Sequence, residues 1–361
     1  MTALSPVALH ETPALNQCLA EPPQGREAQE NAQWWSGLST AEQDYLVAAY
    51  PQQVGMMDGL PAQARHDANL ATLRNDAANG HDPEGAQALL DRVEGSQNGP
   101  AGERIFLLGY EPPGADGNPD AKVIASIGNP DTADNVAIYV PGTGTDLGNV
   151  GGSIDRMDDL RAEAEMVPGS GDTSTIVWLG YDAPDTIPAA IQSHHATDGA
   201  PALVDFTEGL RASHQGPPSH NTVIGHSYGS TVVGTADASG GQGTNDGLQV
   251  DDIVVFGSPG MGYESPDRQG WFDSPLVDDV SDMHIADDHF WAGAASNDVV
   301  SYTEVHGNSP VDWSFGGQRI TTDGASGHSE YWDPGTDALR NQAYIVTGNY
   351  DQVDTVRRRF G

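Results

Sequence analysis

The sequence predicts an α/β protein in which a mostly parallel, doubly wound sheet follows a helical N-terminal segment. After residue 102, apolar runs of strand length alternate with stretches that are compatible with helices. This alternation is typical of βαβ units, whose helices cover both faces of a parallel sheet. Residues 34–95, in contrast, carry helix signals alone. The predicted fold class therefore rests on the alternation of strand and helix signals after residue 102 and on the helix signals alone before it.

The N-terminal part divides into a polar start and a helical segment. Residues 1–33 show little periodicity, and we expect them to be poorly ordered. In residues 34–100, Ser39 followed by Glu42 matches a capping box, which predicts the start of a helix. The helices expected in this segment cover residues 40–49, 61–78 and 83–93.

The remaining residues, 101–361, are expected to form the sheet domain. Two apolar runs separated by proline and glycine turns predict a hairpin of residues 104–110 and 121–127. Later apolar runs predict strands near residues 135–140, 175–181, 222–224, 252–256 and 289–294. The helices expected after the hairpin lie near residues 155–165, 200–211, 229–236 and 337–349.

The charge balance disfavours several classes of partner. Asp and Glu total 52 against 15 Lys and Arg, which gives a formal net charge of −37 at pH 7. Such a surface repels the phosphates of nucleic acids and of anionic lipids. The chain has no apolar run near the ~18 residues that a membrane helix needs, so we expect no integral membrane segment. The acidity suggests adaptation to high salt, with the base composition of the genome as the alternative explanation.

Cysteine usage and the first residues bear on the location of the protein. A single cysteine, Cys18, excludes an intramolecular disulfide framework and a cysteine-based zinc cluster. Residues 1–20 lack the basic start and the long apolar run of a standard signal peptide, so we expect a cytoplasmic protein. A W-x-G match at Trp35 and a Y-x-x-x-D match at Tyr350 leave export by a type VII route as the alternative, although both motifs are short.

The sharpest motif is a G-x-S-x-G pentapeptide, Gly-His-Ser-Tyr-Gly at residues 225–229. It follows a short apolar run and precedes a helix-compatible run of small residues, which is the context of a nucleophile elbow. In such a turn Ser227 is held at the carboxyl end of the sheet, and the two glycines leave room for neighbouring backbone. We therefore expect Ser227 to act as a nucleophile.

A serine nucleophile needs a base and an acid, which follow it in the order acid, then histidine, in doubly wound hydrolases. His328 lies in a loop before the last expected helix and is the expected base, with His306 as the second candidate. Asp298 follows an apolar strand-like run and is the expected acid. The rival acids are Asp267, Asp273, Asp287 and Asp288.

The expected oxyanion hole consists of backbone N–H groups. Tyr228 follows the nucleophile, and Thr143, with Gly142 beside it, lies in the glycine-rich loop after the run 135–140. This loop lacks the G-x-x-x-x-G-K-[ST] pattern of a phosphate-binding loop. The His and Asp residues at 284–289 are interpreted as a solvated acidic turn rather than as metal ligands. No cofactor or metal is expected.

Taken together, these motifs resemble an α/β-hydrolase family of unknown function that is found mainly in actinobacteria. The resemblance covers roughly residues 34–335. It rests on Trp-Trp at 34–35, Leu-Ser at 38–39, Glu-Gln at 42–43, Gly-Met-Met-Asp-Gly-Leu-Pro at 55–61, Arg65 with Asn69, Tyr-Val-Pro-Gly-Thr-Gly at 139–144, the pentapeptide at 225–229, Gly-Ser-Pro-Gly at 257–260 and Gly-His-Ser at 327–329. The resemblance implies an α/β-hydrolase fold with a helical lead-in and a Ser-Asp-His triad, and it implies no substrate. The family's Asp-Pro-Val around the acid is here Asp298-Val-Val.

The sequence therefore predicts a serine hydrolase of carboxylic esters, similar to esterases or lipases. The expected triad is Ser227, His328 and Asp298, and the expected intermediate is an acyl-enzyme. The preference for esters is an analogy at the level of the fold. We expect a small-molecule or lipid-like ester as the substrate, no nucleic-acid partner and an oligomeric state that the sequence does not indicate. The alternative is a catalytically silent hydrolase fold that serves as a binding or interaction module.

Overall fold

The computed structural model describes residues 21–115, 119–239, 247–263 and 276–356. Within these residues an eight-stranded sheet has the order β1-β2-β4-β3-β5-β6-β7-β8. The strands are β1 (Ile105–Glu111), β2 (Lys122–Ile127), β3 (Asn135–Val140), β4 (Thr173–Leu179), β5 (His220–His226), β6 (Asp252–Phe256), β7 (Phe290–Gly293) and β8 (Gln318–Arg319). β2 runs antiparallel to β1 and β4, and the other neighbouring strands pair in parallel. The predicted hairpin and the mostly parallel sheet are confirmed.

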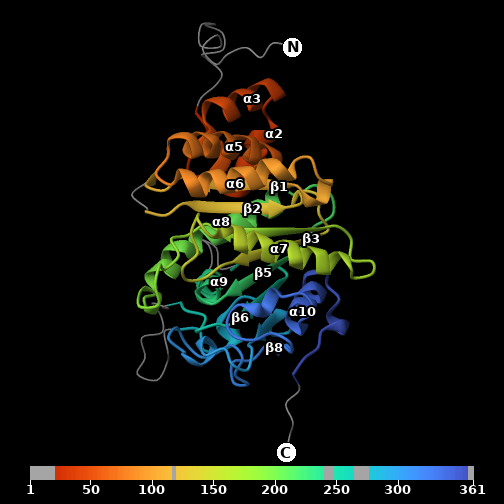
Figure 1. Ribbon diagram of the computed structural model, residues 1–361. Helices are drawn as coiled ribbons and strands as arrows, with labels where there is room; N and C mark the ends of the chain where they lie inside the picture. Colours follow the sequence, from red (N-terminus) through yellow and green to blue (C-terminus); the bar gives the residue numbers. More distant parts are fainter. Residues whose placement is uncertain (1–20, 116–118, 240–246, 264–275, 357–361) are drawn as a thin grey trace, which may run out of the picture.

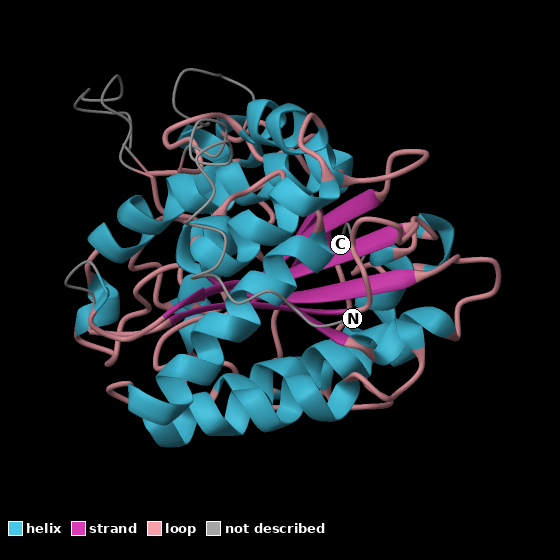
Figure 2. Ribbon diagram, turned by 90° about the horizontal axis from the view of Figure 1, so that it is seen from above, coloured by secondary structure: helices cyan, strands magenta, loops and turns pink. Residues whose placement is uncertain are grey.

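Helices cover both faces of the sheet, as the two ribbon views show (Figure 1, Figure 2). The helices of the sheet domain are α7 (Val150–Glu165), α8 (His194–Ser213), α9 (Tyr228–Ser239) and α10 (Asp337–Val346). α7 and α10 share one apolar core with the strands, and α8 and α9 share the other. Successive strand residues point to opposite faces, so Tyr139 of β3 enters the first core and Ile138 enters the second. None of the described helices combines the length and the apolar character needed to cross a bilayer.

The described part of the chain before β1 is helical, and Figure 1 shows these helices stacked beyond β1 at one end of the molecule. They are α2 (Ala28–Ser36), α3 (Thr40–Ala49), α4 (Pro51–Met56), α5 (Ala62–Asn79) and α6 (Pro83–Ser96). α3 begins at the predicted capping box. The backbone N–H of Ser39 donates to Glu42 Oε2 at 2.7 Å, and the backbone N–H of Glu42 donates to Ser39 Oγ at 3.4 Å.

Two helices differ from the expectations. The prediction of a poorly ordered start over residues 1–33 is wrong for residues 28–33, which belong to α2; residues 1–20 lie outside the described residues. α2 buries Ala28, Asn31 and Trp35 on one side and packs against α8. That side holds only two apolar residues, so its periodicity is weak. α4 is absent from the predicted helices although Pro51 occupies its first position, where a proline needs no hydrogen-bond acceptor.

Helix side chains cover the outer edge of β1. The backbone N–H of Leu107 donates to His66 Nδ1 at 3.0 Å, and the Leu107 carbonyl accepts from Asn69 Nδ2 at 3.0 Å. The backbone N–H of Ile105 donates to Ser96 Oγ at 2.9 Å. An edge strand otherwise leaves such groups unpaired. α5 and α6 therefore supply partners for these three backbone groups of the strand that they cover.

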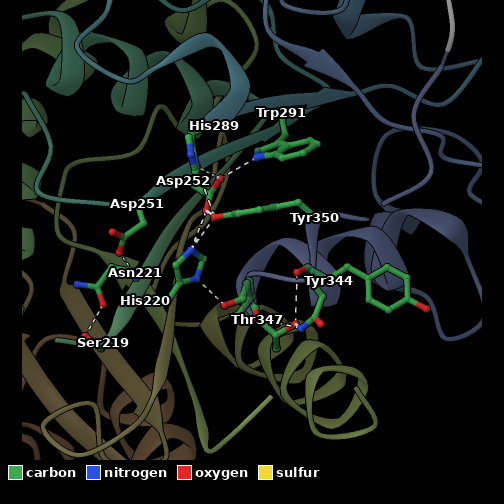
Figure 3. Close-up of polar contacts among 12 residues, drawn as sticks. Ser219, His220, Asn221, Asp251, Asp252, His289, Trp291, Tyr344, Thr347 and Tyr350 are labelled. Atoms are coloured by element: carbon green, nitrogen blue, oxygen red, sulfur yellow. Dashed lines mark hydrogen bonds and ion pairs between the residues drawn. The ribbon is translucent and has the colours of Figure 1, made fainter. Parts of the chain in front are cut away.

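A polar cluster at the amino ends of β5, β6 and β7 joins the residues after α10 to the sheet (Figure 3). Its centre is the fully buried Asp252, and we call it the Asp252 cluster. The donors to this carboxylate are Tyr350 Oη at 2.6 Å, Trp291 Nε1 at 2.8 Å, His220 Nε2 at 2.9 Å and His289 Nδ1 at 3.0 Å. Burial acts to raise the pKa of Asp252, but these hydrogen bonds hold that pKa below its ordinary value. The site described next lies at the opposite, carboxyl ends of the strands.

Candidate active site

Ser227 lies in a tight turn between the last residue of β5 and the first residue of α9. Its φ angle is 54°, in the left-handed region that non-glycine residues rarely adopt, at a cost of about 1–3 kcal/mol. Its backbone N–H donates to the Phe256 carbonyl at 3.0 Å, which fixes the turn to β6. A Cβ at Gly225 would lie 2.6 Å from Ser230 Cα, and one at Gly229 would lie 2.1 Å from the Val140 carbonyl oxygen. Glycine at both positions therefore allows the close packing that holds this turn.

His328 and Asp298 form a hydrogen-bonded pair near the turn. His328 Nδ1 lies 2.9 and 2.8 Å from the two carboxylate oxygens of Asp298. The Asp298 carboxylate also accepts from Tyr331 Oη at 2.5 Å and from the backbone N–H of Val300 at 3.0 Å. Burial acts to raise the pKa of Asp298, but the hydrogen bonds from His328, Tyr331 and Val300 hold that pKa below its ordinary value. An ionised Asp298 keeps the proton of a neutral His328 on Nδ1, so Nε2 is free to accept another proton.

The backbone comes unusually close to this pair at Gly257, directly after β6. A Cβ at this position would lie 2.6 Å from Asp298 Oδ2 and 2.8 Å from His328 Nδ1. The φ angle of Gly257 is 58°, which also favours glycine. Gly257 belongs to one of the motifs that carry the family resemblance, but the motif alone does not reveal this contact.

Two cavities meet at Ser227 and His328, and Thr143 also lines both of them. The polar cavity, of about 290 Å³, is lined by the polar side chains of Tyr139, Asn149, Arg156 and His226, among others. The apolar cavity, of about 210 Å³, is lined by Ile187, Ile191, Pro259, Val300 and Val305, among others. The serine and the histidine are therefore accessible from two sides of different chemical character.

The loop after β3 approaches the turn closely. A Cβ at Gly142 would lie 2.8 Å from Ser227 Cβ and 2.9 Å from the backbone nitrogen of Tyr228. Tyr228 is the first residue of α9, and the first N–H groups of a helix have no acceptor inside the helix. The structure thus brings Gly142, Thr143 and Tyr228 together beside Ser227.

His226, the residue before Ser227, holds the loop that carries His328. Its Nε2 lies 2.6 Å from the carbonyl oxygen of His328, and the two rings are 4.7 Å apart between centroids. Burial, followed by the nearby His328 and Arg156, lowers the pKa of His226 to about 3. His226 is therefore neutral at pH 7 and donates its Nε2 proton to this carbonyl. Sequence reasoning overlooks this residue because its position in the pentapeptide tolerates many side chains.

The other predicted candidates lie elsewhere or serve other roles. His306, the second candidate for the base, is buried, its Nε2 lies 2.7 Å from the Ala190 carbonyl oxygen, and it lines neither cavity. Asp287 and Asp288 are exposed just before the amino end of β7, whereas Ser227 follows the carboxyl end of β5. Asp267 and Asp273 lie outside the described residues.

The two histidines of the expected acidic turn at 284–289 contact two different aspartates. The backbone N–H of His284 donates to Asp237 Oδ2 at 2.8 Å, whereas His289 contacts Asp252. Among the described residues, no group of three or more His, Cys, Asp or Glu side chains is disposed to hold a metal ion.

The sheet order, with an antiparallel second strand and a serine in the tight turn after the fifth strand, defines the α/β-hydrolase class of fold. A family model described as alpha/beta hydrolase matches residues 116–307, which is more than half of the chain. The chain belongs to the alpha/beta hydrolase family, as its motifs predict.

Two mycobacterial proteins are similar to this chain in sequence. An uncharacterized protein of Mycobacterium tuberculosis is 30% identical over 398 residues, which cover 92% of this chain and 57% of the relative. An uncharacterized protein of Mycobacterium bovis is 34% identical over 148 residues, which cover 38% of this chain and 53% of the relative. The chain thus spans little more than half the length of these relatives.

Solved esterases align over much of the chain at low identity. A Pyrobaculum calidifontis esterase aligns with a TM-score of 0.43 and 15% identity, over 78% of this chain and 96% of its own. A Rhizomucor miehei esterase aligns with a TM-score of 0.40 and 11% identity, over 79% of this chain and 96% of its own.

Proposed function

We propose that the protein is a serine hydrolase of carboxylic esters with Ser227 as nucleophile, His328 as base and Asp298 as the acid that orients His328. The observation that carries the proposal is the convergence of these groups. Ser227 stands in a strained turn and lines the same two cavities as His328, whose Nδ1 is bonded to the buried Asp298. A serine is activated as a nucleophile by a histidine that a carboxylate orients, so the placement of these three residues supports the proposal.

The reaction begins when Ser227 Oγ attacks the carbonyl carbon of the ester and His328 Nε2 takes the hydroxyl proton. The backbone N–H groups of Tyr228 and Thr143, with Gly142 giving them room, stabilise the negative oxygen of the tetrahedral intermediate. This intermediate collapses to the acyl-enzyme as His328 returns the proton to the departing alcohol. Water, activated by His328, then attacks the acyl carbon, and the acid product leaves with Ser227 restored.

The apolar cavity supports an ester substrate with a small hydrocarbon part. Ile187 and Ile191 line it and are 71% and 61% exposed, so they present apolar surface at its mouth. A bound hydrocarbon chain would cover this surface and gain about 25 cal/mol for each Å² removed from water. The volume of about 210 Å³ favours short chains over long ones.

The test is covalent labelling with a fluorophosphonate, which reacts with activated serines, together with hydrolysis of 4-nitrophenyl butyrate. We expect the native protein to be labelled once and to hydrolyse the ester. Ser227→Ala should remove the label and lower kcat by a factor of about 10⁴ or more. Ser36→Ala, which removes an exposed hydroxyl from α2, is the matched control and should keep both.

The alternative of a silent binding module makes the opposite forecast. Folded native protein that takes up no label and turns over no ester, at each salt concentration where circular dichroism shows it folded, would contradict the proposed function. Labelling at a serine other than Ser227 would contradict the assignment of the nucleophile.

A further inference from the structure

Arg156 of α7 places a positive charge in the polar cavity, beside Ser227 and His328. Its Nη1 donates to Tyr139 Oη at 3.0 Å, and its guanidinium carbon lies 5.2 Å from the centroid of the Trp332 ring. Both of these aromatic side chains are buried. They hold the guanidinium by one hydrogen bond and one ring contact, which leaves the rest of its donors for another partner.

Within the described residues, Arg156 forms no ion pair with a carboxylate of the protein. The arginines that do pair with Asp or Glu are Arg65, Arg74, Arg92, Arg161, Arg211 and Arg340. Among the described residues, Arg26, Arg104 and Arg319 also lack such a partner, but of these four arginines only Arg156 lines a cavity together with Ser227.

The surroundings of Arg156 also exclude acidic side chains. No Asp or Glu is among the described residues that line the polar cavity or the apolar cavity. The neighbouring His226 is neutral at pH 7, because burial, followed by the nearby His328 and Arg156, lowers its pKa to about 3. Arg156 is thus a cation in a cavity whose described lining holds no carboxylate, within a strongly acidic molecule. A guanidinium with free donors presents a planar fork that can bind a carboxylate through two parallel hydrogen bonds.

We propose that Arg156 binds a carboxylate of the substrate, so that the preferred substrates are esters with an anionic group on one side of the scissile carbonyl and an apolar group on the other. The anionic group occupies the polar cavity, and the apolar group occupies the cavity at Ile187 and Ile191. The proposal rests on the proposed function, because the ester must reach Ser227 between the two cavities. Arg156 acts here as a specificity-determining residue.

The experiment compares pairs of esters that differ only in charge. One pair carries the charge on the acyl side: 4-nitrophenyl hemisuccinate and its methyl ester. The other carries it on the alcohol side: 4-acetoxybenzoate and its methyl ester. At one fixed salt concentration, we expect native protein to prefer the anionic member of one pair. Arg156→Gln should lower kcat/KM for that anionic ester about ten- to hundredfold. It should change kcat/KM for the neutral ester less than about threefold.

Two further variants separate a specific contact from a general loss of charge. Arg156→Lys keeps the charge without the planar fork, and we expect it to retain part of the preference. Arg92→Gln also removes one positive charge beside α7, because Arg92 pairs with Asp155, but Arg92 lines neither cavity. We expect Arg92→Gln to leave kcat/KM for both pairs of esters unchanged. The proposal is overturned if Arg156→Gln affects charged and neutral esters equally, or if native protein prefers the anionic member in neither pair.

A binding measurement keeps this proposal independent of turnover. Calorimetry with Ser227→Ala measures binding of monomethyl succinate and of neutral dimethyl succinate. We expect tighter binding of the anion, and loss of that difference in the double variant Ser227→Ala, Arg156→Gln. If native protein is not labelled by the fluorophosphonate but the Arg156-dependent binding persists, the proposed function fails and the carboxylate site stands. If labelling succeeds and the binding does not depend on Arg156, only the carboxylate site fails.

Discussion

At the scale of single residues, the sequence identifies candidates for the reacting groups of the proposed mechanism, but it does not identify the residues that position these candidates. Ser227, Asp298 and His328 carry recognisable chemistry and occur in the expected chain order. Tyr331 and Gly257 acquire meaning only in the folded chain, because their contacts with Asp298 join segments 33 and 41 residues apart. No periodicity or short motif encodes such a contact.

Gly257 offers a sharp test at this scale. In Gly257→Ala, the new methyl group would displace His328 or Asp298, and a displacement of about 1 Å can lower activity about a hundredfold. We expect kcat/KM for 4-nitrophenyl butyrate to fall by that factor. The control is Gly348→Ala, at a φ of 66° with no heavy atom near the added Cβ.

Both alanine variants place a side chain at a positive φ, so both should lose about 1 kcal/mol of unfolding free energy in urea titrations, and Gly257→Ala should lose more because its methyl group also displaces neighbouring side chains. Only Gly257→Ala should also lose activity. Equal activity in the two variants would show that the Asp298–His328 pair tolerates displacement or plays no part in turnover.

At the scale of secondary-structure elements, strands and long helices were predictable because apolar runs and capping signals are local. α3 starts at its predicted capping box, and the strands lie close to their expected positions. α2 and α4 were missed for different reasons. α2 gains its stability by burying one side against α8, far along the chain, whereas the signal for α4 at Pro51 looked like the end of the preceding helix.

The Asp252 cluster gives a pH prediction for the elements that it joins. His220 contacts the Val346 carbonyl at 2.8 Å through Nδ1 and Asp252 at 2.9 Å through Nε2, so both ring nitrogens face acceptors. Burial acts to lower the pKa of His220, but these hydrogen bonds raise it above the ordinary value near 6.5. This stabilisation is therefore complete below about pH 6.5 and is lost as the pH rises through the raised pKa. Asp252, with its lowered pKa, contributes above about pH 4 and loses its contribution as the pH falls further.

We expect the contribution of His220 to the unfolding free energy, measured by urea titration, to decline as the pH rises from about 6 to about 9. His220→Gln should flatten this decline, whereas the matched control His289→Gln should retain it. Asp252→Asn should cost about 3 kcal/mol at pH 6, because it leaves buried donors and a charged histidine without their carboxylate. An unchanged slope in His220→Gln would refute this account of the cluster.

At the scale of the whole molecule, the net charge of −37 dominates the electrostatics. Nearby acidic groups affect the pKa of two partly buried aspartates. Burial, followed by the charges of Asp185 and Asp182, raises the pKa of Asp120 to about 6. On α7, burial and the nearby Asp158 and Asp155 raise the pKa of Asp159. Such groups repel one another in the folded protein more than in the unfolded chain.

We expect the unfolding free energy at pH 7 to rise as NaCl increases from about 0.05 M to about 1 M, since the screening length falls to about 3 Å at 1 M. Asp159→Asn removes one like-charge pair with Asp155 and should stabilise the protein by a few tenths of a kcal/mol at low salt. That gain should vanish at high salt. Stability that does not respond to salt would leave the composition of the genome as the better explanation of the acidity.

The covered edge of β1 has a consequence for how the polypeptide can be divided. Leu107 and Ile105 satisfy their outward backbone groups through His66, Asn69 and Ser96, all of which precede the sheet. A fragment that starts at residue 101 would expose these groups along a row of apolar side chains, which is a template for adding strands from other molecules. By covering this edge, α5 and α6 disfavour self-association of the sheet. They are therefore part of the same folding unit as the strands.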